Sequence, residues 1–481
     1  GVRPAKEARD HVWCRRVFLD LIGRIPTVDE LDAYMSGSRR TRDQELVDQL
    51  LGSEYVEEYA GYWSTVWANA LIGRAGGNDR RDPTSRAGMN DYLRRSFLEN
   101  KPYDVFCREL VEAEGGSQPG MENYNGAVNF LIGKMEENGV QATAKTAQIF
   151  LGMAVQCTQC HNHPFNEYRQ NQFWELNAFF RQTRVQTEGM DRQARMRYAS
   201  LIETDFAGQG RLQGGDNRRE IFLEMRDGKL VDRDQGSVND APIYYELRNG
   251  QVQVAYPVFV DGQSLTEKFA DRGAEFGNSG RLSDVDRRRE LVEYILASEH
   301  FEQALVNRTW AHFFGYGFTK PIDDMGPHNP PSHPALLAKL AERFRDGGFD
   351  MKALLRSIVL SKPYRLSSRI TSGNKEDDPE LGRPPLFSRF YLRQMQPEQL
   401  YESLLTATRA DATTSDENQD ALRARWLRQF VTAFGNDEQT EASSFNGSIP
   451  QALMMMNGEL MKRACRIDGD SFLGGVAKDP N

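Results

Sequence analysis

Residues 43–74 read DQELVDQLLGSEYVEEYAGYWSTVWANALIGR, and their pattern indicates the class of fold. Apolar side chains recur at intervals of three and four residues, which is the spacing of one face of an α-helix. Ser53 suits the N-cap position between two helices, because a serine hydroxyl can accept a hydrogen bond from a backbone N–H of the first turn. The segment therefore predicts two helices that meet near Ser53.

Helical spacing continues on both sides of this segment. Upstream, CRRVFLDLIGRIPTVDELDAYM predicts one helix that ends near Gly23 and another that begins after Thr27, with Glu30 as the capping-box partner of Thr27. Downstream, TAKTAQIFLGMAVQC (residues 143–157) predicts a helix whose C-terminal end carries Cys157. The first part of the chain therefore reads as a helical domain.

The pattern changes between residues 184 and 280. REIFLEMRDGKLVD (219–232) and APIYYELRNGQVQVAYPVFVDG (241–262) are rich in β-branched and aromatic residues, and their Asp-Gly and Asn-Gly pairs favour tight hairpin turns. Helical spacing then returns. We expect a mainly α protein with two helical domains, 1–183 and 281–481, joined by a linker with a small β-rich insertion at 184–280. An ordinary structural role is the simplest interpretation of that insertion.

Composition excludes several classes of protein. The 481-residue chain has 60 basic and 69 acidic side chains and a net charge of −9, and its basic residues are scattered, so nucleic acid is not an expected partner. No apolar run approaches the length that spans a membrane. The five cysteines are too few for a disulfide framework. Because the chain opens on Gly1 rather than methionine, we expect a processed form whose signal peptide was removed.

The most specific motif is the pentapeptide from Cys157 to His161, CTQCH. Covalent haem attachment needs two thiols spaced to meet the two vinyl groups and an adjacent histidine to ligate the iron, so this pattern is typical of a c-type haem site. Zinc is the alternative, because Cys157, Cys160, His161 and His163 are suitable ligand types. Structural zinc sites usually join two ligand pairs across a long loop, which favours haem here. A redox dithiol fits less well, since the cysteines follow a helix rather than begin one.

The sixth ligand of the iron stays open. His163 and Met153 lie too close to His161 along the chain to reach the opposite face of a porphyrin. The remaining candidates come from elsewhere in the chain: His312, His328, His333, Met190 and Met325. A methionine or histidine there would favour electron transfer, whereas an open position would favour binding or activation of a small molecule.

Side chains that follow the motif are candidates for the surroundings of a cofactor. Phe165 and Trp174 could form apolar walls, and Arg169 could pair with a haem propionate. An ordinary place in a helix core explains the aromatic residues equally well, and a solvated surface position explains the arginine.

Several long segments, in order, resemble the secreted cytochrome-type proteins of planctomycetes, in which a PSCyt domain is followed by a PSD domain. The resemblance covers nearly the whole chain. The segments that carry it are CRRVFLDLIGRIPTVDELDAYM, FLGMAVQCTQCHNHPFNEYRQNQFWELNAFF, ALVNRTWAHFFGYGF, DDMGPHNPPSHPALLAKLAERF, LLRSIVLSKPYRLSSR and GSIPQALMMMNG. It implies one covalent haem c on Cys157 and Cys160, with His161 as axial ligand, and export to the periplasm or beyond. It supplies no reaction, because the function of the family is largely unknown.

The same segments contain further polar side chains that are candidates for a site: His163, Asn307, Arg308, Asp323 and Asp324. Each has a structural alternative. The two aspartates could satisfy backbone N–H groups in a tight loop, and Asn307 and Arg308, on a predicted helix, could tie the two domains together.

The segments also bear on the distal ligand. His312 and His333 lie within them, which favours these two histidines over His328, whereas Met325 stands where we expect an aromatic residue in this family. Ser332 is most simply the N-cap of the helix that opens at His333 and the proline after it.

We therefore expect an exported, monohaem c-type cytochrome-like protein that transfers electrons or performs haem-based redox chemistry with a redox partner protein or a small molecule. Whether it is an enzyme stays open, because no catalytic triad, P-loop or dinucleotide motif is present. The alternative is a non-catalytic surface or assembly protein whose Cys/His cluster binds a structural zinc or haem. Such a protein could form a homo- or hetero-oligomer at the cell surface.

Overall fold

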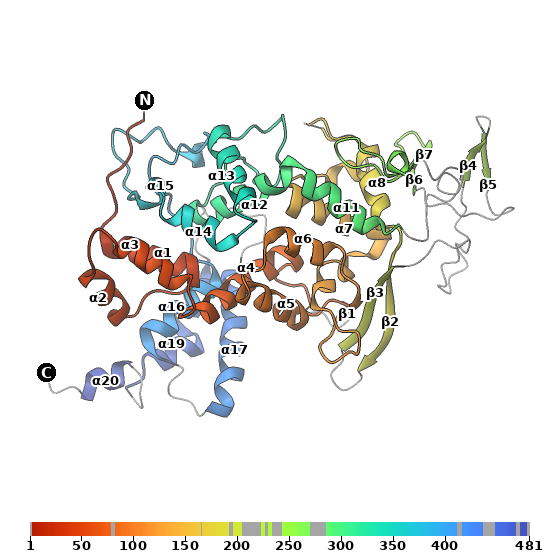
Figure 1. Ribbon diagram of the computed structural model, residues 1–481. Helices are drawn as coiled ribbons and strands as arrows, with labels where there is room; N and C mark the ends of the chain where they lie inside the picture. The colour runs from red at the N-terminus through yellow and green to blue at the C-terminus, as the bar shows by residue number, and fades with distance from the viewer. Residues whose placement is uncertain are drawn as a thin grey trace.

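The computed structural model describes residues 2–77, 82–164, 166–191, 196–203, 223–226, 229–232, 243–269, 285–410, 416–435, 448–467 and 472–478. Helices dominate these residues, and the strands are few and short (Figure 1). The expectation of a mainly α protein with a small β-rich insertion is confirmed.

The N-terminal part is built of helices joined by short connections. They are α1 (Asp10–Ile22), α2 (Val28–Ser36), α3 (Arg42–Leu50), α4 (Val56–Ile72), α5 (Arg86–Leu98), α6 (Tyr103–Val111), α7 (Glu136–Thr146) and α8 (Gln170–Asn177). Short 3₁₀ helices and one π-helical segment lie among them. The 3₁₀ helices are η1 (Gly126–Phe130), η2 (Ile132–Lys134), η4 (Gln156–Gln159) and η5 (Ala178–Phe180), and the π-helical segment is η3 (Ala147–Leu151).

Two of the predicted helix ends are confirmed and one is wrong. Helix α1 ends at Gly23, whose φ of 80° is the left-handed conformation that glycine adopts without strain. The capping box forms, because Glu30 N donates to Thr27 Oγ1 at 3.2 Å and Thr27 N donates to Glu30 Oε2 at 2.7 Å. Ser53 does not cap α4, which begins at Val56 after Tyr55 with no side-chain cap.

The C-terminal part is also helical. After the short helix α9 (Leu265–Lys268) of the insertion, it contains α11 (Arg287–Ala297), α12 (Glu299–Phe314), α13 (Pro334–Asp346), α14 (Met351–Val359), α15 (Lys362–Arg365), η8 (Pro379–Leu381), α16 (Pro397–Thr408), α17 (Asp416–Phe434), α18 (Ile449–Asn457), α19 (Glu459–Ala464) and α20 (Phe472–Lys478). No helix among the residues that the structure describes is long and apolar enough to span a membrane.

The strands form antiparallel ribbons. One sheet has the order β1-β3-β2, from β1 (Gly115–Gly116), β2 (Thr183–Asp191) and β3 (Met196–Glu203). Two hairpins follow within the insertion: β4 (Leu223–Arg226) with β5 (Lys229–Asp232), and β6 (Ile243–Glu246) with β7 (Val252–Ala255). The hairpin predicted around Asn249-Gly250 is confirmed, whereas the predicted Asp227-Gly228 turn lies outside the described residues.

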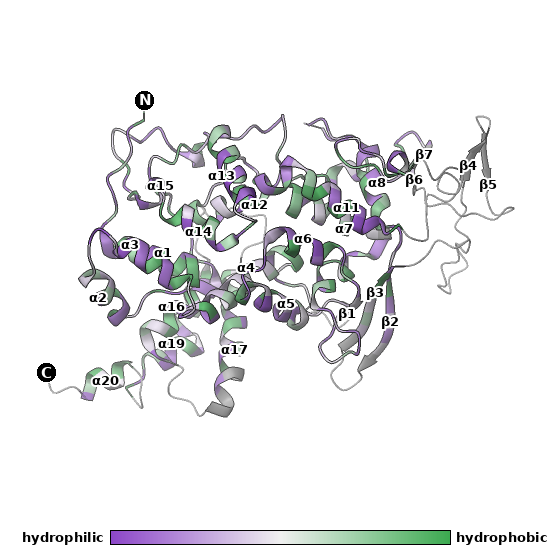
Figure 2. Cartoon of the chain, in the orientation of Figure 1, coloured by the Kyte–Doolittle hydropathy of each residue, from purple (hydrophilic) through white to green (hydrophobic). Residues whose placement is uncertain are grey.

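The two helical parts of the chain share one large hydrophobic core that runs from Trp13 to Tyr391. Across it, the ring of Tyr103 stacks on that of Phe301 with centroids 4.9 Å apart. Helices on both sides carry apolar and polar residues on the same ribbon (Figure 2), as amphipathic helices around a common core do. A second, smaller core gathers residues of α16, α17 and α19 around the buried ring of Trp426. The expected boundary at residue 183 falls at the start of β2, and that at 280 falls outside the described residues.

Candidate functional site

The cysteine motif does not continue a helix, contrary to the prediction. Helix α7 runs into the π turn η3 and stops at Gly152, which has a φ of 63°. A Cβ on Gly152 would lie 2.8 Å from the sulfur of Met325, and the Gly152 carbonyl accepts a hydrogen bond from Met325 N at 2.8 Å. The helix therefore ends where the C-terminal part packs on it, and Cys157 lies on the separate 3₁₀ turn η4.

This turn exposes both of its thiols. Cys157 and Cys160 are free and exposed, whereas Thr158 between them is buried and donates from Oγ1 to the carbonyl of Val155 at 2.6 Å. Cys14 shows the opposite behaviour, because burial raises the pKa of its thiol to about 12. The turn thus holds its backbone by an inward threonine and presents two thiols to solvent.

His161 has one ring nitrogen engaged and the other suited to a metal. Its Nδ1 lies 2.6 Å from the carbonyl oxygen of Asn162. Because a carbonyl can only accept, Nδ1 carries the proton, and in the neutral ring Nε2 then holds the lone pair. Histidines that ligate metals usually donate their other N–H to a carbonyl or carboxylate in this way. The donor set of Cys157, Cys160 and His161 therefore fits covalent haem with an imidazole ligand.

Helix α8 holds the turn in place through hydrogen bonds to its backbone and to Asn162. The carbonyl of Gln159, between the two cysteines, accepts hydrogen bonds from Gln170 Nε2 at 3.2 Å and from Trp174 Nε1 at 3.1 Å. Asn162 Oδ1 accepts from Gln170 N at 3.0 Å. The structure thus brings Trp174 to the motif, and the indole nitrogen rather than an apolar wall makes the contact. Phe165 lies outside the described residues, and Arg169 is exposed just before α8.

A surface depression of about 490 Å³ lies beside His161. The residues that line it are His161, Asn162, Pro164, Gln170, Leu247 and Arg248. Leu247 and Arg248 belong to the β6–β7 turn, so the insertion reaches the candidate site. Sequence reasoning did not find this contact, although the Asn249-Gly250 pair marks the turn that follows Arg248.

His163, after the motif, faces the Pro-rich loop of the C-terminal part, which is residues 321–333 between α12 and α13. The rings of His163 and His328 lie 6.4 Å apart, and the ring of Tyr168 lies 6.0 Å from His328. His328 Nε2 is 2.9 Å from Asp324 Oδ1, and the Tyr168 hydroxyl donates to the carbonyl of Met325 at 2.8 Å. The structure therefore pairs His163 with the histidine that the sequence had ranked below His312 and His333.

Both aspartates of the loop bind side chains, so their predicted role as acceptors of backbone N–H groups is wrong. Asp323 accepts from Arg308 Nη2 at 2.6 Å and from Gln148 Nε2 at 3.0 Å. Arg308 Nη2 also donates to the carbonyl of Gln148 at 3.2 Å, which ties α12 to η3 as the domain-linking interpretation expected. Asn307 instead holds the Pro-rich loop, donating to Ile322 O at 2.9 Å.

The other candidates for the distal ligand have partners elsewhere. His312 Nε2 lies 3.0 Å from the Tyr62 hydroxyl, and desolvation, assisted by the nearby Arg393 charge, lowers the pKa of His312 to about 3. The ring of His333 lies 5.5 Å from that of Phe387, and burial lowers its pKa. Neither histidine is among the residues that line the depression beside His161.

Three further expectations concern this region. The prediction that Ser332 caps α13 is wrong, because the helix begins after His333, which occupies the N-cap position. Met325 is buried against Gly152, and the side chain of Met190, on β2, lies outside the described residues. Within the described ranges, no group of three or more His, Cys, Asp or Glu side chains is arranged to hold a metal ion.

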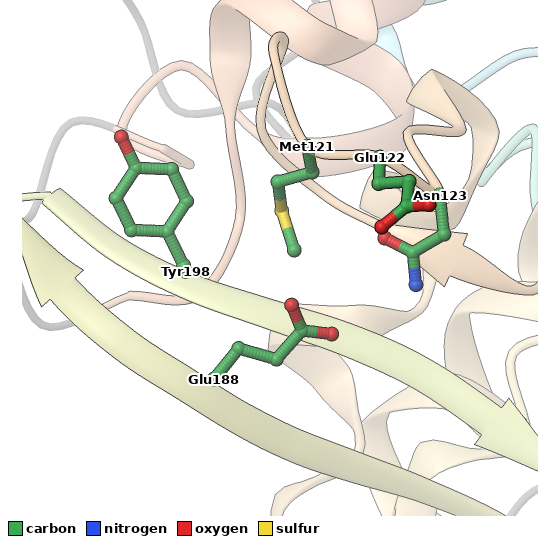
Figure 3. Close-up of a pocket in the computed structure, with 5 residues that line it drawn as sticks. All are labelled: Met121, Glu122, Asn123, Glu188 and Tyr198. Carbon is green, nitrogen blue, oxygen red and sulfur yellow. The ribbon is translucent and has the colours of Figure 1, made fainter.

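A second depression of about 540 Å³ lies against β2 and β3. Figure 3 shows the residues that line it: Met121, Glu122, Asn123, Glu188 and Tyr198. Asn123 Nδ2 donates to Ser200 Oγ at 3.1 Å, and that hydroxyl in turn contacts Glu188. Its lining contains neither cysteine nor histidine, so it is chemically distinct from the depression beside His161.

Comparison with known families gives two matches, in order along the chain. The family model for PSCyt2, described as a protein of unknown function (DUF1549), matches residues 1–185. The family model for PSD1, described as a protein of unknown function (DUF1553), matches residues 287–471. No curated protein and no solved structure matches the chain.

Proposed function

The chain belongs to the family in which a PSCyt2 domain is followed by a PSD1 domain, and on this basis we propose that it is an exported monohaem c-type cytochrome-like protein. It would transfer electrons to or from a partner protein, or perform haem-based redox chemistry on a small molecule. One observation carries the proposal: the turn η4 exposes Cys157 and Cys160 beside His161, whose hydrogen bond leaves Nε2 as the ligating nitrogen.

The chain's own groups account for how the cofactor would be held. Cys157 and Cys160 would hold the haem through two thioether links, one to each vinyl group. His161 Nε2 would ligate the iron, because the Asn162 carbonyl keeps the imidazole in the required tautomer. When bound, haem supplies one-electron chemistry at the iron.

The hydrogen bonds that hold the backbone of the cysteine turn support the same function. Gln170 and Trp174 both bind the Gln159 carbonyl, so the backbone between the two cysteines is fixed before any ligand is attached. A site held in advance loses little conformational entropy on binding. The exposure of both thiols supports a cofactor near the surface, within reach of a partner. Because haem of this type is attached outside the cytoplasm, the proposal includes an extracytoplasmic location.

The test is a reduced-minus-oxidised visible spectrum together with the mass of the denatured chain, after expression with a c-type haem maturation system. We expect c-type bands and a mass increase of one haem. Cys157→Ser should abolish stable retention of the cofactor. The matched control is Cys465→Ser, an exposed thiol outside the motif, which should leave retention unchanged. His163→Ala should also leave attachment intact, because His163 contacts the C-terminal part through His328.

The same measurements separate the alternatives. Reduced bands that shift with carbon monoxide or cyanide favour a small-molecule-binding protein, whereas bands that do not shift favour electron transfer. A colourless chain with one zinc ion, or with two thiols open to alkylation, contradicts the haem proposal. That result would favour the non-catalytic surface or assembly protein, for which oligomeric state is the next measurement.

A further inference from the structure

We propose that the β6–β7 hairpin of the insertion is part of the cofactor site, and that Arg248 at its tip binds a propionate carboxylate of the haem. This inference rests on the proposed function, because it takes a haem on Cys157 and Cys160 as its premise. It assigns a role to an insertion that the sequence alone presents as an ordinary structural appendage.

One indole connects the hairpin to the cysteine turn. The ring of Trp174 stacks on Tyr245 of β6, with centroids 5.9 Å apart and planes 15° from parallel. The same side chain donates from Nε1 to the carbonyl of Gln159, between the two cysteines. In Figure 1, β6 and β7 lie beside α8, the helix that carries Trp174. The position of the hairpin is therefore coupled to the position of the motif.

Packing beneath the hairpin fixes it further. Tyr245 and Ala255, from its two strands, are buried together with Ala178, and Leu247 packs against this cluster. Buried apolar contact of this kind orders a two-stranded hairpin that would be marginal in water by itself. The hairpin thus has a defined place next to α8.

The turn of the hairpin places Arg248 at the edge of the depression beside His161. Leu247 N donates to the Gln251 carbonyl at 2.8 Å, and Gln251 N donates to Asn249 Oδ1 at 3.0 Å. Gly250 has a φ of 79°, the conformation that a tight hairpin turn requires of this position. Leu247 and Arg248 line the same depression as His161.

The charge and shape of this wall fit the edge of a porphyrin. Arg248 is exposed, and among the residues that the structure describes no carboxylate forms an ion pair with its guanidinium. A guanidinium matches the geometry of a carboxylate through two parallel N–H donors, and Leu247 beside it offers apolar contact. A flat apolar ligand with peripheral carboxylates satisfies both side chains. Arg169, the earlier candidate for this pairing, is not part of the lining.

The experiment measures the midpoint potential of the haem-loaded full chain by spectroelectrochemistry, with the denatured mass recorded for every variant. Arg248→Gln should retain the haem mass and show a lower midpoint potential than the parent. The reason is that an unpaired propionate stabilises the ferric state, which carries one more positive charge than the ferrous state. Tyr245→Ser removes the stack that holds the hairpin and should lower the potential in the same direction.

Two further arginine variants make the result specific. Arg169→Gln tests the rival propionate partner, and Arg428→Gln removes an exposed charge on α17, which lies far from β6 and β7 in Figure 1. Both should match the parent. The inference is overturned if Arg248→Gln matches the parent, or if Arg169→Gln or Arg428→Gln shifts the potential equally. If the denatured mass of the parent chain shows no haem, the proposed function is wrong, and this inference is wrong with it.

Discussion

The cysteines of this chain differ in expected reactivity, because the fold buries some of them and exposes others. Burial raises the pKa of Cys14 to about 12 and raises that of Cys107 as well, so neither thiol ionises near neutral pH. Cys157 and Cys160 are exposed on a turn whose backbone is fixed. A reagent that reacts with surface thiols should therefore distinguish these two pairs before any cofactor is attached.

His312 makes stability depend on pH. Desolvation lowers its pKa in the folded protein to about 3, against 6.5 for the ordinary side chain. Above pH 6.5 the ring is neutral in both states, and as pH falls below that value only the unfolded chain binds the proton. Each pH unit lost then costs about 1.4 kcal/mol, so the group lowers the free energy of unfolding by about 2 kcal/mol at about pH 5.

The variant that tests this is His312→Gln, which does not titrate and keeps a polar partner for the Tyr62 hydroxyl. Urea unfolding at about pH 7 and at about pH 5 should show a smaller loss of stability in the variant, by about 2 kcal/mol. The pKa values of His300 and His333 are also lowered by burial, but both remain in parent and variant and cancel. Equal losses in the two proteins would contradict the assignment.

At the scale of elements, the loop between α12 and α13 contacts both helical parts of the chain. Asp323 is the centre of these contacts, because it binds both Arg308 of α12 and Gln148 of η3. The Arg308 and Asp323 side chains are only 19% and 17% exposed, so an unpaired Arg308 would be poorly solvated. The same loop carries His328, which faces His163.

We expect Asp323→Ala to lower the free energy of unfolding by about 2 kcal/mol, because it leaves the Arg308 guanidinium without its carboxylate. Glu342→Ala, which removes the exposed partner of Lys339 on α13, is the matched control and should leave the free energy of unfolding at the value of the parent. Chemical denaturation of both variants beside the parent measures the difference. Similar values for the two variants would show that Asp323 contributes no more than a surface ion pair.

At the scale of the whole molecule, the two family segments are not separate folding units, because one hydrophobic core contains residues of both. Arg288 of α11 shows the dependence, since its Nη1 donates to the carbonyls of Val111 and Ala113 at 2.9 and 2.8 Å. A domain with its own core could fold alone, whereas a part that lacks half of a shared core exposes apolar surface.

We therefore expect residues 1–203, expressed alone, to bind a hydrophobic dye and to unfold without a cooperative transition, because the partner surface of Tyr103 on Phe301 is missing. Addition of residues 285–481 should restore cooperative unfolding, as followed by circular dichroism on heating. The full chain is the control. A cooperative transition in the isolated N-terminal fragment would contradict the dependence on a shared core.

Features of the fold and site could be predicted where the interacting residues are close together in the sequence. The capping box at Thr27 and the hairpin turn at Asn249 are local, because residues a few positions apart make the whole interaction. The break before Cys157 was not predicted, since TAKTAQIFLGMAVQC has unbroken helical spacing, whereas in the structure the helix ends at Gly152, which is left-handed and packs against Met325 from far along the chain. Ser53 also failed as a cap, because α4 begins three residues later, at Val56.

By itself, the sequence determined the mainly helical class, the order of the two family segments and the trio Cys157, Cys160 and His161, because each is encoded by neighbours in the chain. The tertiary structure alone decided that Arg248 and His161 line one depression, that His163 faces His328, and that the two helical parts share a core. These pairings join residues scores of positions apart, and only the burial of apolar surface in the folded chain brings them together.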